Sequence, residues 1–400
     1  METAAFDRCL HFFVEGMKKT ICFICSVFIA IVMNAAGPET VEHWEKVSRP
    51  ELLQLFRTGM YGCSPDDWSK LKYEVLEEDS LALGGKATRR QVRLLWEGSR
   101  NGQYTDVLIY WPNSVKGKVP MLLGLNFEGN QTIIDDPGII ISEAYAEDPN
   151  FFFKCTGVVN HKATEASRGS NSDDWPVEKI LDRGYGLATA YREEIASDNE
   201  PYFSTGVHLV YPELQEREDN FSTISAWAWA LSRIADYLVA DPKTDTGRLA
   251  VFGFSRLGKT ALWAAAQDER FTAVISQMSG AGGAKLFRRF IGEDIHRLCT
   301  VFPHWYCRNF RKYMGKDGSL PFDQHQMMSL IAPRALYVSS ALDDKMSDPE
   351  GEYQGLMATL PVYEMYSRHP KVGYHIRPGG HDVLPLDWDN YLNFLDMVWR

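Results

Sequence analysis

The sequence lacks any run of lysine and arginine, any low-complexity linker and any internal repeat. Its 53 acidic residues exceed its 42 basic ones, which gives a formal net charge of -11. Because phosphate binding needs a basic face, this balance argues against a nucleic-acid partner. The 400 residues, 45% of them hydrophobic, can bury a large core, so one catalytic domain over 37–400 is the simplest organisation.

The apolar run near the amino end, residues 21–33, is too short to cross a bilayer comfortably. Two lysines precede it, and the small residues Ala35 and Ala36 follow it, which is typical of a secretory signal peptide. We therefore expect residues 1–36 to be a signal peptide, with Met17 as an alternative start, and no stable membrane span once it is removed. Export to the periplasm or the extracellular space follows from it, and an uncleaved anchor is the alternative.

Cysteine is scarce, and removal of the signal peptide leaves only Cys63, Cys155, Cys299 and Cys307. Disulfides form readily in exported proteins, and Cys299 and Cys307 are close enough in sequence to pair. Connectivity cannot be read from spacing, so a Cys299–Cys307 disulfide and free thiols remain alternatives.

Aromatic residues, in contrast, are plentiful, with 11 tryptophans. They suit a cleft that stacks on sugar rings, and an aromatic-rich core is the equal alternative.

Extended runs alternate with helical patterns, such as those over 223–240 and 256–268, from the third run onward. This alternation predicts a three-layer α/β fold, with a mostly parallel sheet and helices on both faces. The first two runs predict an antiparallel hairpin at the edge of the sheet. Active groups collect at the carboxyl ends of parallel strands, so we expect the site there. The eight runs are 89–98, 104–112, 119–129, 184–192, 247–255, 271–280, 334–343 and 373–381.

Ser255 follows the fifth run in "VFGFSRLGK", where Gly253 can supply the positive φ or the close approach of a sharp strand-to-helix turn. The spacing departs from G-x-S-x-G because Leu257 holds the place of the second glycine. A small residue at a tight turn is the plain interpretation. The later "SSALDD" and "PGGHD" favour a nucleophile, because serine, aspartate and histidine then follow in the chain order of the α/β-hydrolases.

The chemistry assigns a role to each of these groups. A serine hydroxyl is a poor nucleophile alone, so His381 would take its proton during attack and return it to the leaving group. A carboxylate must orient that imidazole, and Asp344 and its neighbour Asp343 are the candidates after the seventh run. His375 lies within the last strand and is interpreted as structural.

The sequence contains the longer segments "GFSRLGKTALWAAAQDERF", "SGAGGAKLFRRFIGE", "FPHWYCRNF", "IAPRALYVSSALDDKMSDPEGEY" and "GGHDVLPLDWDNYLNF". Together they resemble carbohydrate esterase family 15, the glucuronoyl esterases, in its bacterial branch. The resemblance implies an α/β-hydrolase that cleaves the ester between a 4-O-methylglucuronate branch of xylan and a lignin alcohol. It implies plant cell-wall polysaccharide as the partner and neither a metal nor an organic cofactor, and we expect a monomer. Another carbohydrate esterase, such as an acetylxylan esterase, and an inactive carbohydrate-binding homologue are the alternatives.

The same resemblance assigns oxyanion stabilisation to Arg256, together with backbone N–H groups, and sugar contacts to Lys259 and Glu293. A guanidinium with five fixed donors suits the charge of an oxyanion. Without the resemblance, Lys259 and Glu293 would more often be solvated charges on helices.

Two positions depart from the family pattern. Met278 stands where some members carry a triad glutamate before "SG", so the acid must come from the following strand, where Asp344 fits. Met346 stands where a tryptophan usually lines the sugar site, which removes a stacking face. Trp305 remains as an aromatic candidate for substrate binding.

Overall fold

The computed structural model describes residues 40–69, 71–96, 102–150, 155–199, 205–367, 369 and 371–399. Residue contacts divide the chain into two units, 1–48 and 49–400. In the first, helix α2 (Val41–His43) is capped by the Thr40 side chain, which accepts a hydrogen bond from the His43 amide. The expected signal peptide, 1–36, lies outside the described residues, and the domain boundary at residue 37 stays a prediction.

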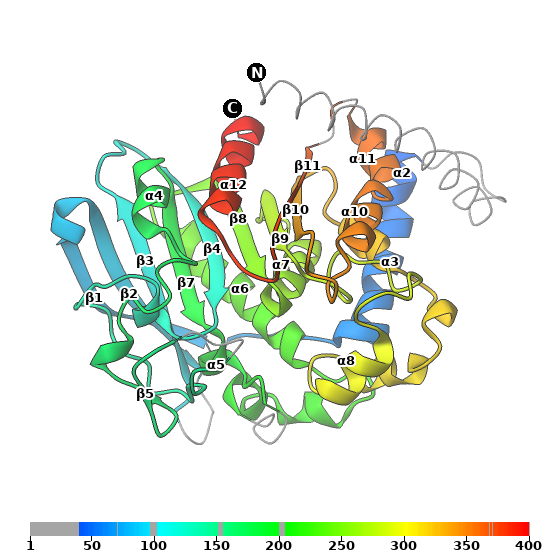
Figure 1. The fold of residues 1–400 in the computed structure, drawn as a ribbon, viewed down its shortest axis with the longest axis horizontal. Helices are drawn as coiled ribbons and strands as arrows, with labels where there is room; N and C mark the ends of the chain where they lie inside the picture. Colours follow the sequence, from blue (N-terminus) through cyan, green and yellow to red (C-terminus); the bar gives the residue numbers. More distant parts are fainter. Residues whose placement is uncertain are drawn as a thin grey trace. The chain divides into compact units, whose positions relative to one another are not determined.

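The second unit contains a mixed sheet of nine described strands, in the order β1-β2-β3-β7-β4-β8-β9-β10-β11 (Figure 1). Strands β4 and β7 to β11 run parallel to one another, whereas β1, β2 and β3 are antiparallel to their neighbours. The strands are β1 (Leu71–Ala82), β2 (Ala87–Trp96), β3 (Tyr104–Pro112), β4 (Val119–Asn126), β7 (Gly186–Tyr191), β8 (Thr244–Phe254), β9 (Ala273–Gln277), β10 (Ala335–Ala341) and β11 (Val372–Arg377), with β5 (Val158–Val159) and β6 (Lys162–Ala163) forming a separate ribbon.

The edge of the sheet differs from the sequence prediction. The β2–β3 hairpin forms as expected, but β1 pairs with the outer side of β2 and takes the edge position. The residues of β1, LKYEVLEEDSLA, carry charges on both faces and are largely exposed, so they show none of the apolar pattern of a buried strand. The predicted α/β-hydrolase architecture is otherwise confirmed.

Helices cover both faces of the sheet (Figure 1). On one face, α4 and α12 pack on the strands in a single apolar cluster, in which Trp388 lies 4.7 Å from Phe252 between ring centroids. On the other face, α6 and α7 pack against each other and against β8. The described helices of this unit are α3 (Arg49–Phe56), α4 (Val177–Asp182), α5 (Arg192–Ile195), α6 (Thr223–Ala240), α7 (Arg256–Gln267), α8 (Ile295–Val301), α9 (Gln324–Ser329), α10 (Pro349–Met357), α11 (Leu360–Tyr366) and α12 (Pro385–Val398).

Helix α6 shows how the sequence sets these layers. Ser222 caps its first turn by accepting a hydrogen bond from the Ser225 amide, and alanines and tryptophans line most of its length. Small side chains let a helix approach its neighbours closely, while each fully buried large apolar side chain contributes about 1.5–3 kcal/mol. Among the described helices, none combines the length and apolar character needed to span a membrane.

The four cysteines that the structure describes are all free, which corrects the disulfide alternative. Cys307 begins a 3-10 helix, and its Sγ faces the Thr58 carbonyl. Cys299 lies in the last turn of α8. Closeness in sequence therefore does not pair these two thiols.

Candidate active site

The turn between β8 and α7 holds Ser255 in an unusual backbone conformation, with φ 57° and ψ -128°. Such a conformation costs a non-glycine residue on the order of 1–3 kcal/mol and persists only where the surroundings impose it. A Cβ at Gly253 would lie 1.9 Å from the Leu257 carbonyl oxygen, so this position needs glycine because of the close approach. The turn lifts the Ser255 hydroxyl above the carboxyl end of the sheet.

The structure brings Ser255, His381 and Asp344 into one hydrogen-bonded chain. The Ser255 Oγ lies 2.9 Å from His381 Nε2, and His381 Nδ1 lies 2.6 Å from Asp344 Oδ2. These groups come from the ends of β8, β11 and β10, which meet at the same edge of the sheet. His381 is also packed against the Phe254 ring, with centroids 4.6 Å apart.

Asp344 is buried and ionised. Burial alone would raise the pKa of its carboxyl group. The hydrogen bond and charge of His381 outweigh that effect, so the pKa lies below its usual value. The Ser347 amide donates to its other oxygen at 3.2 Å. Asp343 turns elsewhere, because its carboxylate accepts a hydrogen bond from the Gly379 amide at 3.2 Å.

The end of β9 carries Met278 in place of an acid. Met278 is buried, has a positive φ of 46°, and donates its amide to the Ser339 carbonyl at 2.8 Å. A thioether offers no charge to an imidazolium, so this position cannot orient His381 electrostatically.

A second acid near these strand ends, Glu352 of α10, was not found from the sequence. It accepts hydrogen bonds from the Gly280 amide at 2.9 Å and from Ser340 Oγ at 2.6 Å. Complete burial raises the pKa of its carboxyl group to about 8. Glutamate in an ordinary helical pattern gives no sequence signal of this burial.

Arg256 occupies the first turn of α7, immediately after Ser255. Its Nη1 forms an ion pair with Asp198, which follows α5. Asp198 was not predicted from the sequence. An acid shortly after the end of β7, in "REEIASD", was the available signal, because that strand also delivers residues to the carboxyl edge.

Lys259 and Glu293 lie together as an ion pair of 2.9 Å between Nζ and Oε2. The Lys259 ammonium also donates to the Ala281 carbonyl at 2.6 Å, and its side chain is only 3% exposed. Neither residue is a solvated helix charge, so that alternative is wrong for both.

Met346 and Trp305, the two positions expected to line the sugar site, differ in their exposure to solvent. Met346 is 44% exposed, on the turn that follows Asp344. Trp305, in contrast, is 2% exposed, with its ring stacked on Phe302 at 3.7 Å between centroids. Arg256 lies over the Trp305 ring, 4.8 Å from Cζ to the centroid. Trp305 is therefore almost fully covered in this structure, and its role in substrate binding stays a prediction.

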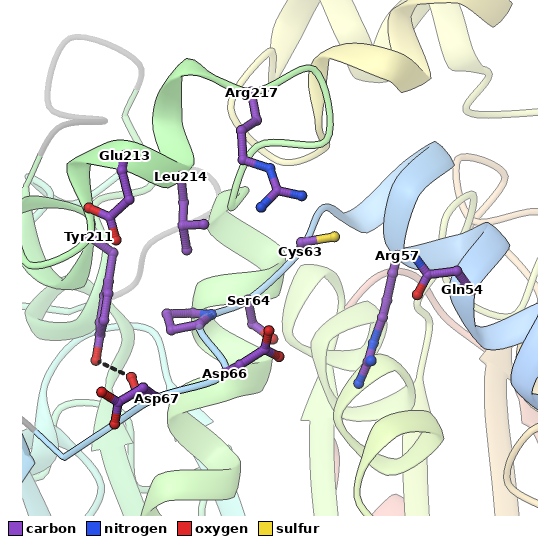
Figure 2. Close-up of a pocket in the computed structure, with 11 residues that line it drawn as sticks. Gln54, Arg57, Cys63, Ser64, Asp66, Asp67, Tyr211, Glu213, Leu214 and Arg217 are labelled. Atoms are coloured by element: carbon purple, nitrogen blue, oxygen red, sulfur yellow. Dashed lines mark hydrogen bonds between the residues drawn. The ribbon is translucent and has the colours of Figure 1, made fainter.

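A pocket of about 460 Å³ lies apart from these groups (Figure 2). The Tyr211 hydroxyl donates to the Asp67 carbonyl at 3.0 Å at one side of it. The residues that line it are Gln54, Arg57, Cys63, Ser64, Pro65, Asp66, Asp67, Tyr211, Glu213, Leu214 and Arg217, which include none of the predicted site. Within the described ranges, no three histidine, cysteine or acidic side chains are placed to hold a metal ion.

Comparison with known proteins identifies the family. A family model described as glucuronyl esterase of fungi matches residues 177–367. Carbohydrate esterase MZ0003, from an unknown prokaryotic organism, is 39% identical over 385 residues, covering 92% of this chain and 88% of that protein.

Two solved bacterial structures share the fold over nearly the whole chain. A glucuronoyl esterase from Solibacter usitatus is 39% identical with a TM-score of 0.83, covering 90% of this chain and 95% of that one. A promiscuous CE15 esterase from a marine bacterial metagenome is 38% identical with a TM-score of 0.83, covering 91% and 94%. On this similarity, the chain belongs to carbohydrate esterase family 15, the glucuronoyl esterases.

Proposed function

We propose that this chain is an exported serine esterase that hydrolyses 4-O-methyl-glucuronoyl esters between glucuronoxylan and lignin alcohols. The observation that carries the proposal is the continuous hydrogen-bonded chain from Ser255 through His381 to Asp344 at a strained strand-to-helix turn. The family name of its bacterial relatives supports the glucuronoyl substrate.

In the proposed reaction, Ser255 Oγ attacks the ester carbonyl carbon while His381 Nε2 accepts the hydroxyl proton. Asp344 accepts the hydrogen bond from Nδ1 and stabilises the imidazolium. The alcohol leaves with the proton from His381, and an acyl-enzyme remains on Ser255. Water then attacks this ester, again deprotonated by His381, and the uronic acid is released as the serine regains its proton.

Arg256 is the proposed stabiliser of the oxyanion. It directly follows Ser255, and its side chain remains 17% exposed. A guanidinium carries five donors, so one ion pair leaves others for a ligand. The neighbouring Lys259–Glu293 pair supplies further polar groups for sugar hydroxyls, and Met346 would border the substrate.

A second candidate is an esterase of broader carbohydrate specificity. The exposed Met346 replaces a large aromatic ring that would hold one sugar tightly, and one close structural neighbour is described as promiscuous. An inactive binding homologue fits poorly, because the hydrogen-bonded serine, histidine and aspartate are all present.

Turnover of benzyl glucuronate beside acetylated xylan, by the wild type and Ser255→Ala, tests the proposal. We expect the wild type to prefer the glucuronate and the variant to lose essentially all turnover while keeping its circular dichroism spectrum. A preference for acetylated xylan would favour the second candidate. Near-normal kcat in folded Ser255→Ala would reject the nucleophile.

A further inference from the structure

We infer that Asp198 is a positioning residue that holds the Arg256 guanidinium ready for the developing oxyanion. The inference rests on the proposed function of Arg256. It concerns a carboxylate that touches neither Ser255 nor His381 and would act only through the arginine.

The Asp198 carboxylate gathers four cationic or polar donors. Its Oδ2 forms ion pairs with Nη1 of Arg192 and Nη1 of Arg256, each at 2.5 Å. Its Oδ1 accepts from Trp305 Nε1 at 2.6 Å and faces His304 Nε2 at 3.2 Å. Four partners match the four acceptor positions of a carboxylate, so the group is held on all sides.

The carboxylate also keeps its charge. Burial raises the pKa of Asp198, but the charges of Arg192 and Arg256 and the hydrogen bond from His304 lower it to well below the usual range. Asp198 is therefore ionised at neutral pH and stays paired with the two guanidinium groups.

The consequence falls on Arg256. Its Nη1 is fixed by Asp198, and its Cζ lies 4.8 Å and 5.3 Å from the ring centroids of Trp305 and Phe302. A free arginine side chain must lose considerable rotamer freedom before it can bind. Here that freedom is restricted before substrate arrives, while the side chain stays 17% exposed. Donors fixed in advance are the kind that stabilise a transition state more than a ground state.

Asp136 offers a matched control. It is a similarly buried carboxylate, paired with Arg89 Nη1 at 2.6 Å and with the Tyr110 hydroxyl at 2.6 Å. Both Asp136→Asn and Asp198→Asn remove one buried charge beside an arginine, so both should lower the Tm. Only Asp198→Asn should lower kcat, by roughly 10- to 100-fold with KM nearly unchanged, a smaller loss than removal of an oxyanion donor itself.

A double-mutant cycle separates positioning from general damage. If Asp198 acts through Arg256, Asp198→Asn should cost little more once Arg256→Ala is present, because the group it positions is gone. Full additivity in the cycle, or wild-type kcat in folded Asp198→Asn, would overturn the inference. If Asp198→Asn does not fold, Asp198→Glu keeps the charge and shifts the carboxylate by one methylene. It should lower kcat in the same way, and unchanged kcat there would count equally against the inference.

These outcomes are distinct from a failure of the proposed function. Ser255→Ala reports on the nucleophile and Arg256→Ala on the oxyanion contact. If Ser255→Ala is inactive but Arg256→Ala affects only KM, the esterase assignment stands and the positioning inference falls.

Discussion

The carboxyl ends of β9 and β10 lie side by side and differ in one respect. Strand β9 is followed directly by Met278, which is buried and has a positive φ but no charge. Strand β10 leads to Asp344, whose carboxylate lies 2.6 Å from the His381 ring nitrogen. The strands are parallel neighbours, with Gln277 beside Ser339. Two adjacent strand ends can therefore deliver an acid to one histidine, and this chain places a carboxylate at only one of them.

The largest expected loss of kcat comes from replacing the acid that follows β10, Asp344. We expect Asp344→Asn to lower kcat by roughly 10³- to 10⁴-fold, because the imidazole loses the group that orients it and stabilises its charge. Asp343→Asn is the matched control and should cost far less, since the Asp343 carboxylate faces the Gly379 amide. Steady-state kinetics on a glucuronate ester measure both. A fully active Asp344→Asn enzyme would show that a different acid serves His381.

A smaller change in kcat is expected when a carboxylate is placed after β9, at position 278. Met278→Glu in the Asp344→Asn background should return part of the lost kcat, if a carboxylate at the β9 end reaches the imidazole. Met278→Gln has nearly the same size without the charge, so it should return nothing. Equal activity of the two variants would show that the β9 end does not face His381. Circular dichroism must confirm that each folds, because position 278 is buried.

The smallest effect concerns Glu352, which bonds to both strand ends through Gly280 and Ser340. Its folded-state pKa is raised to about 8, so the unfolded chain loses this proton first as the pH rises. Stability should therefore fall between about pH 4.5 and pH 8, by on the order of 1 kcal/mol per pH unit for this group. Glu352→Gln replaces the titratable carboxyl group with a neutral amide of similar size.

The difference in Tm between Glu352→Gln and the wild type should thus shift in favour of the variant from pH 5 to pH 8. Thermal unfolding at several pH values measures it. A difference that stays constant with pH would mean that Glu352 is ionised in the folded protein at neutral pH.

Much of this arrangement could be predicted from periodicity and order. Strand β3 (Tyr104–Pro112) and helix α6 (Thr223–Ala240) match the expected runs because their apolar patterns are uninterrupted. The chain order of Ser255, Asp344 and His381 placed each at a strand end, and parallel strand ends share an edge. Their proximity followed from the fold class alone.

Other features depend on tertiary neighbours and left no local pattern. Glu352 and Asp198 look like ordinary acids in the sequence, and only the burial of their side chains distinguishes them. Likewise, no pattern in the sequence indicated that the Trp305 ring stacks on Phe302 and lies beneath the Arg256 guanidinium. Sequence spacing shows which residues an element carries, but it does not show which of their faces are covered.

The charged edge strand β1 has a consequence for association between molecules. An open sheet edge exposes unpaired amide and carbonyl groups that can recruit a strand from another chain. Strand β1 carries four acidic residues within six positions, Glu74, Glu77, Glu78 and Asp79. Its pairing with β2 is irregular at two places. A second copy adding its own β1 would bring like charges together, on a strand whose irregularities already disturb a regular ladder. The same acidic residues that prevented prediction of this strand thus disfavour edge-to-edge pairing of two molecules.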